Sequence, residues 1–170
     1  MKSVAIFVDI ANLYYCIDRK WPGRKLDYSA LTRVAQGESA FIYRSIAYGL
    51  QHRSEATPFI ALLKHLGYEV RYRRPRMYRE ENSGKMVERR TSWSMGIALD
   101  IVDAVLGNKV DEVILGSSDG DLAPLVTWLA IRKIKTTVLA CGISQELRRV
   151  CPNCIEVSEE LLIRETAKAT

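Results

Sequence analysis

Two of the uninterrupted apolar runs in this sequence, residues 4–8 and residues 113–115, each end at a polar break. A strand without polar residues at alternate positions is buried on both faces, as the strands of parallel sheets are. Asp9 follows the first run directly, and the second leads into a glycine, serine and aspartate turn over residues 116–121. The pattern predicts two buried parallel strands, each ending at a carboxylate.

The remaining elements follow from the spacing of apolar residues and from capping and turn signals. Further strands are predicted over residues 40–49, 68–72 and 135–140, and residues 155–157 are a candidate for a last strand. Helices are predicted over residues 12–18, 27–35, 58–66, 92–106, 122–131 and 144–150, with a terminal helix beginning at Ser158. This alternation predicts an α/β fold, a three-layer α/β/α sandwich with a parallel sheet. The length of 170 residues predicts a single domain.

Positive charge is concentrated in one segment, residues 73–91. The whole chain carries a formal net charge of +5, which suits a polyanionic partner. The segment contains a polar turn and is expected to be either a protruding β-hairpin or a loop. A solvent-exposed charged face is the ordinary interpretation, but its place beside the predicted site favours contact with RNA phosphates. The arginines expected to make that contact are Arg73, Arg74, Arg76, Arg89 and Arg90.

Three carboxylates, those of Asp9, Asp119 and Asp121, lie at predicted strand ends. Ligands of open α/β sheets bind at the carboxyl ends of the strands. Any one of these residues alone could equally be a helix N-cap, but together they form a cluster that would repel itself without a cation. Oxygen ligands suit Mg²⁺ or Mn²⁺, and such an ion can activate water for phosphodiester hydrolysis. Asn12 is placed to orient a carboxylate or contact a phosphate.

Residues 7–13, Phe-Val-Asp-Ile-Ala-Asn-Leu, and residues 114–125, Ile-Leu-Gly-Ser-Ser-Asp-Gly-Asp-Leu-Ala-Pro-Leu, together resemble the NYN domain family of the PIN-like nuclease superfamily. The resemblance implies a five-stranded parallel sheet in the order 3-2-1-4-5 and metal-dependent ribonuclease activity. On this resemblance, Asp9, Asn12, Asp119 and Asp121 match the acidic and polar residues of the family's site.

The sequence departs from the family pattern at the helix before the fourth strand. The family carries a Lys-x-x-Asp element there, followed six residues later by another Asp. Asp100 matches the later Asp, whereas Ser94 stands in the position of the first acid and Thr91 in that of the lysine. We therefore expect Asp100 to be an additional ligand or to hold one, and Ser94 to orient water or substrate. The alternative is a catalytically degenerate RNA-binding or regulatory module.

Other patterns narrow the function further. Cys151 and Cys154 have the C-x-x-C spacing of redox or zinc sites, but without a second pair a structural role is favoured. A phosphatase-like or nucleotide-binding protein is disfavoured because no phosphate-cradling glycine loop follows the first strand. No apolar run is long enough to span a membrane, and the chain leads straight into a strand, so a cytoplasmic location is expected. The oligomeric state stays open, a homodimer included.

Overall fold

The computed structural model describes residues 2–37, 40–50, 57–73, 76–80, 84–89, 92–107 and 109–164. Its helices are α1 (Ile10–Lys20), α2 (Tyr28–Gln36), α3 (Thr57–His65), α4 (Ser94–Leu106), α5 (Ala123–Ile131) and α6 (Gln145–Val150). Its strands are β1 (Lys2–Asp9), β2 (Arg24–Leu26), β3 (Ala40–Leu50), β4 (Glu69–Arg73), β5 (Arg76–Arg79), β6 (Met86–Arg89), β7 (Glu112–Gly116), β8 (Lys135–Ala140), β9 (Asn153–Glu156) and β10 (Leu162–Arg164). Within these ranges, no helix is long and apolar enough to cross a membrane.

A parallel sheet of six strands in the order β4-β3-β1-β7-β8-β9 forms the centre of the structure. The predicted α/β class is confirmed, and the first five strands have the expected order. The expected count of five is corrected to six. The additional edge strand, β9, pairs with β8 and begins two residues before the run from which a last strand was suggested.

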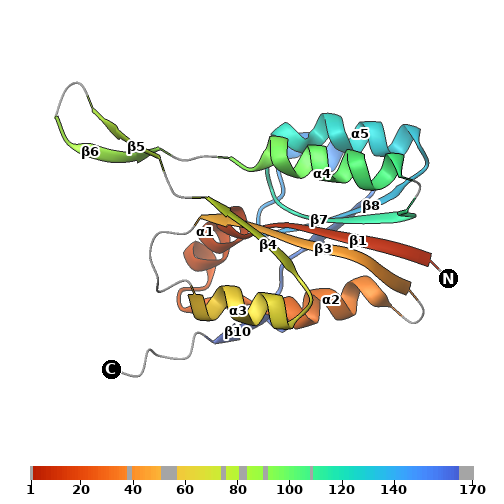
Figure 1. The fold of residues 1–170 in the computed structure, drawn as a ribbon, viewed down its shortest axis with the longest axis horizontal. Helices are drawn as coiled ribbons and strands as arrows, with labels where there is room; N and C mark the ends of the chain where they lie inside the picture. The colour runs from red at the N-terminus through yellow and green to blue at the C-terminus, as the bar shows by residue number, and fades with distance from the viewer. Residues whose placement is uncertain are drawn as a thin grey trace.

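Helices cover both faces of this sheet (Figure 1). Helices α4 and α5 pack on one face, and α1, α2 and α3 lie on the other. The apolar runs of the two central strands lie between these layers, and residues 4–8 of β1 and 113–116 of β7 are all buried. Burial of both faces explains why neither strand shows polar alternation.

The segment that follows β9 differs from the sequence prediction. Instead of a terminal helix from Ser158, a single 3₁₀ turn (Glu159–Leu161) leads into β10. Strand β10 pairs antiparallel with the three-residue β2, and the N–H of Asp27 donates to the carbonyl of Leu161 at 2.8 Å. Leu162 is buried while Ile163 is exposed, the alternation of a half-buried strand. The helical expectation was wrong because the pairing partner lies at the other end of the chain.

The basic segment is a hairpin in its described part. Strands β5 and β6 pair antiparallel, with Arg79 opposite Met86, and they project away from the three layers in Figure 1. Met77, Tyr78 and Met86 are exposed. The antiparallel pairing is what the hairpin alternative predicted for the described residues of this segment.

Candidate functional site

The site lies where β1 and β7 end side by side. Val8 pairs with Gly116 in the parallel register, so the chain leaves both strands at one edge of the sheet. Asp9 is the last residue of β1, and its Oδ1 accepts the N–H of Asn12 at 3.1 Å as the N-cap of α1. Asp9 is also buried, with only 6% of its surface exposed. It therefore caps the helix and at the same time holds a carboxylate at the strand edge.

Asn12 connects the two halves of this edge. Its Oδ1 accepts both the N–H and the hydroxyl of Ser118, each at 2.9 Å. The amide thus ties the first turn of α1 to the loop after β7. Asn12 therefore positions the loop that carries Asp119.

Both carboxylate oxygens of Asp119 are held by neighbours. Oδ1 accepts the N–H of Asp121 at 3.1 Å. Oδ2 accepts the Ser94 hydroxyl in a short hydrogen bond and faces the Ser92 hydroxyl at 3.4 Å, and the two serine oxygens lie 2.6 Å apart. The serine at the position of the family's acid is therefore a direct hydrogen-bond partner of Asp119. Ser92 is a contributor that the sequence reasoning missed, although it precedes the helix in a polar Ser-Trp-Ser stretch.

The electrostatics of the site disfavour an ionised Asp9. Burial raises its pKa above the ordinary value, and the nearby charge of Asp119 raises it further, whereas the N–H groups of Asn12 and Ala11 and the charge of Arg73 lower it. The net direction is upward. Two carboxylates that approach each other in a poorly solvated place favour either a proton or a cation between them.

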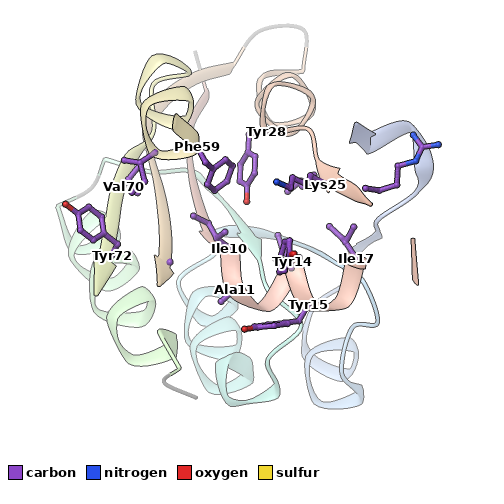
Figure 2. A pocket seen from close by; sticks show the side chains of 15 residues that line it. Ile10, Ala11, Tyr14, Tyr15, Ile17, Lys25, Tyr28, Phe59, Val70 and Tyr72 are labelled. Carbon is purple, nitrogen blue, oxygen red and sulfur yellow. The ribbon is translucent and has the colours of Figure 1, made fainter. Parts of the chain in front are cut away.

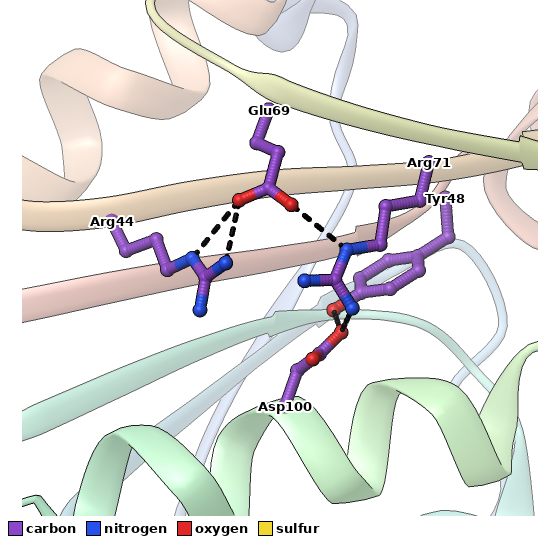
Figure 3. Close-up of polar contacts among 5 residues, drawn as sticks. All are labelled: Arg44, Tyr48, Glu69, Arg71 and Asp100. Atoms are coloured by element: carbon purple, nitrogen blue, oxygen red, sulfur yellow. Dashed lines mark hydrogen bonds and ion pairs between the residues drawn. The ribbon is translucent and has the colours of Figure 1, made fainter.

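Asp100 makes its contacts elsewhere (Figure 3). Its Oδ2 accepts the hydroxyl of Tyr48 at 2.6 Å and forms a short ion pair with Arg71. Arg71 also contacts Glu69 at 2.9 Å, and Glu69 contacts Arg44 at 2.6 Å. We call Asp100, Tyr48, Arg71, Glu69 and Arg44 the Asp100 network.

The Asp100 network stabilises its own charges. Its arginines lower the pKa of Glu69, with the hydrogen bond from Arg44 as the largest cause. Burial and the hydrogen bond to Asp100 raise the pKa of Tyr48, which keeps its proton. The expected role of Asp100 as an additional ligand stays a prediction. In this structure its carboxylate contacts Tyr48 and Arg71.

Asp121 is exposed in the 3₁₀ turn (Gly120–Leu122) that precedes α5. It lines a shallow groove with Ser92 and Ser94. Throughout the part of the chain that the structure describes, no group of three or more Asp, Glu, His or Cys side chains converges as a metal cage would. The structure brings Asp9 and Asp119 into electrostatic contact and leaves Asp121 at the rim.

Arg73 is the predicted RNA-binding arginine whose side chain the structure describes at this site. Its guanidinium lies 4.3 Å from the ring centre of Trp93 and donates to the carbonyl of Ser92. The Trp93 indole in turn donates to the carbonyl of Gly49 at 3.0 Å. This stacking holds a positive charge close enough to lower the pKa of Asp9.

The other four arginines cannot be placed in the same way. Arg74 and Arg90 lie outside the described residues. Arg76 and Arg89 pair through their backbones in the hairpin, and their side chains also lie outside the description. Their contact with RNA stays a prediction.

The donor chemistry is compatible with Mg²⁺ or Mn²⁺. Asp9 and Asp119 present oxygen ligands only, and Mg²⁺ commonly uses one or two carboxylates together with waters and substrate phosphates. The arrangement therefore fits an ion shared with a bound phosphate better than one enclosed by protein alone.

The cysteines contact backbone carbonyls. Cys151 donates through Sγ to the carbonyls of Thr136 and Asn153, and Cys154 donates to that of Cys151. The four cysteines are free thiols, and burial raises the pKa of Cys141 and Cys154. Reactive cysteines have lowered pKa values, so these features favour the structural role.

The fold is an α/β sandwich in which a carboxylate ends β1 and another lies in the turn after the neighbouring strand β7. The NYN domain profile matches residues 3–160, and the chain belongs to this family, which includes ribonucleases. The chain is 27% identical over 162 residues to the low amplitude and bright protein LabA of Synechococcus elongatus, covering 92% of this chain and 84% of LabA. It is also similar to the crystal structure of VPA0982, a protein of unknown function from Vibrio parahaemolyticus, with a TM-score of 0.80, 28% identity, and coverage of 95% and 96% of the two chains.

Proposed function

We propose that this protein binds RNA across the carboxyl edge of β1 and β7 and hydrolyses its phosphodiester bonds with a divalent metal ion. The observation that carries this proposal is the placement of Asp9 at the end of β1 and of Asp119 in the turn after the neighbouring strand β7, where the charge of Asp119 raises the pKa of the buried Asp9. Such a pair is costly unless a proton or a cation neutralises it, and a divalent cation does so at neutral pH. Membership of a family that includes ribonucleases supports phosphodiester hydrolysis as the reaction.

When bound, Mg²⁺ or Mn²⁺ would lower the pKa of a water molecule and offset charge on the phosphate. Asp9 and Asp119 would hold the ion. Ser94 fixes the direction of the Asp119 carboxylate by donating to Oδ2. Asn12 keeps the loop in register with α1 by accepting from Ser118. Such outer contacts typically change metal affinity or activity about 10–100-fold when removed.

Arg73 would hold the RNA backbone. Its guanidinium is oriented by the Trp93 ring and by the Ser92 carbonyl, so little side-chain freedom remains to be lost when a phosphate binds. Asp121 stands at the exposed rim, where its carboxylate would orient water or help to hold the ion. One edge of the sheet thus supplies carboxylates for the metal ion, hydrogen bonds that orient them, and the Arg73 guanidinium for an RNA phosphate.

A second candidate is RNA binding without cleavage, and two specific observations favour it. Ser94 supplies a hydroxyl in place of the family's acid, and Asp100 is neutralised by Arg71. Both changes reduce the negative charge available to a metal ion. This candidate retains Arg73 and the hairpin and predicts that RNA binding is independent of metal.

The test is a cleavage assay on labelled single-stranded RNA with Mn²⁺ and Mg²⁺ titrated. We expect metal-dependent cleavage that falls by at least about 100-fold in Asp119→Asn and in Asp9→Asn. Asparagine retains an acceptor oxygen for the neighbouring donors, so both variants should fold. Asp103→Asn is the matched control, since Asp103 is exposed on α4. Cleavage that persists in Asp119→Asn would refute the assignment of hydrolysis to this site, whereas binding without any cleavage would establish the second candidate.

A further inference from the structure

A cavity of about 320 Å³ adjoins the start of α1, the helix that Asp9 caps. Ile10 and Ala11, the two residues that follow Asp9, form part of its wall, and Gly49 near the end of β3 forms another part. The cavity therefore opens at the same edge of the sheet as the candidate site. Its size is at the lower end of the range for pockets that hold small organic groups.

Aromatic side chains line this cavity together with aliphatic ones (Figure 2). Tyr28 of α2 and Phe59 of α3 lie on one wall with their ring centres 5.7 Å apart, and α1 forms the facing wall with Ile10 and Tyr14. Tyr14 is 43% exposed, so its ring is accessible from outside. Aromatic walls of this kind suit a flat ring, which gains from stacking and edge-to-face contacts.

A few polar groups accompany the rings. The hydroxyl of Tyr28 points into the cavity, and Lys25 of β2 extends toward its middle (Figure 2). Arg24, the neighbour of Lys25, also lines the cavity. A heteroaromatic ring with carbonyl or ring-nitrogen acceptors and a nearby phosphate matches these groups.

We propose that this cavity binds one nucleobase of the RNA strand whose backbone crosses the Asp9 and Asp119 edge. The inference rests on the proposed function, because it uses the same strand. Tyr28 and Phe59 would contact the base, the Tyr28 hydroxyl would meet its polar edge, and Arg24 and Lys25 would face the adjoining phosphate. Because Ile10 and Ala11 join the two sites, the captured base would set which phosphodiester bond lies at the carboxylates.

The experiment measures RNA binding in EDTA, so that cleavage cannot interfere. Fluorescence anisotropy is recorded for a short labelled single-stranded RNA and for the same strand with abasic residues. Ile60→Trp fills the cavity from α3, where Ile60 is one of its lining residues. Ile131→Trp adds the same bulk at an exposed position of α5, on the opposite face of the sheet. Tyr28→Phe removes only the hydroxyl, and it decides the question if Ile60→Trp fails to fold by circular dichroism.

We expect Ile60→Trp to bind the base-containing RNA about 10-fold more weakly than the wild type, within the range for loss of one stacked base. Ile131→Trp should bind as the wild type does. Tyr28→Phe should change the preference among the four bases. The abasic strand should bind wild type and Ile60→Trp equally, because only the base enters the cavity.

Failure of the cavity proposal can be distinguished from failure of the proposed function. If the wild type binds RNA but Ile60→Trp and Tyr28→Phe bind both strands as it does, the cavity proposal is overturned and the proposed function stands. Calorimetry with nucleoside monophosphates covers the case in which RNA does not bind. Binding of a monophosphate that Ile60→Trp abolishes would identify a nucleotide site while refuting the RNA role, and absence of both kinds of binding would overturn both proposals.

Discussion

Replacing Asp100 by alanine tests whether this carboxylate serves the fold rather than the metal. Its partner Tyr48 is fully buried, and the Tyr48 hydroxyl donates to Oδ2 of Asp100 at 2.6 Å. Arg71, the other partner, is more accessible, with 35% of its side chain exposed, and it keeps its contact with Glu69. The substitution therefore leaves the buried Tyr48 hydroxyl without an acceptor and Arg71 without one of its two carboxylate partners.

The cost follows from these two partners. A buried hydroxyl left without an acceptor costs about 1–3 kcal/mol. Loss of the partly exposed ion pair with Arg71 adds at most about 1 kcal/mol because solvent screens it. We expect Asp100→Ala to lower the free energy of unfolding by about 2–3 kcal/mol. For a chain of this size that corresponds to a fall in Tm of about 4–12 °C.

A double-mutant cycle with Tyr48→Phe isolates the hydrogen bond. Tyr48→Phe alone should lower the free energy of unfolding by about 1 kcal/mol. In the Asp100→Ala background it removes a hydroxyl that already lacks its acceptor, so it should lower that free energy by almost nothing. Urea unfolding followed by circular dichroism gives the four free energies. Strict additivity of the two substitutions, or an Asp100→Ala variant as stable as the wild type, would refute the reasoning. If the role of Asp100 is to anchor α4 to β3 and β4, Asp100→Asn should also keep any cleavage activity within about tenfold of the wild type.

Three further predictions concern the strand edge. The pKa of Asp9 is raised in the folded protein above its ordinary value of 3.8. Between these two pKa values the folded state binds more protons than the unfolded chain, so the free energy of unfolding falls as the pH rises through that window. Asp9→Asn should therefore be more stable than the wild type at pH 7 in EDTA, and thermal melts should show the difference vanishing near pH 4. Gly116→Ala should lower the free energy of unfolding by about 1–3 kcal/mol in urea titrations, because its Cβ would lie 3.1 Å from Cγ1 of Val8; unchanged stability would contradict the packing. Arg73→Ala should weaken RNA binding and reduce the slope of log affinity against log salt by about 1, and an unaltered slope would exclude a phosphate contact by Arg73.

The sequence was sufficient for the features that depend on neighbouring residues or on burial. Continuous apolar runs identified β1 and β7, because strands buried on both faces need no polar positions. A carboxylate at the end of β1 and another in the turn after β7 placed Asp9 and Asp119 at one edge, since parallel strands end together. Local turn and charge signals likewise located the hairpin formed by β5 and β6.

Only the tertiary structure decided the features that depend on distant partners. Tyr48 and Arg71 lie 52 and 29 residues from Asp100, and only the order of the strands brings them to its carboxylate. Strands β2 and β10 are three residues each, too short for a signal of their own, and they exist because they pair. The aromatic cavity is built in the same way from residues of several elements whose spacing along the chain has no period. Pairing and packing across long separations depend on the whole fold. Local sequence patterns therefore determined the position of the strand-edge carboxylates but not the contacts that Asp100 makes.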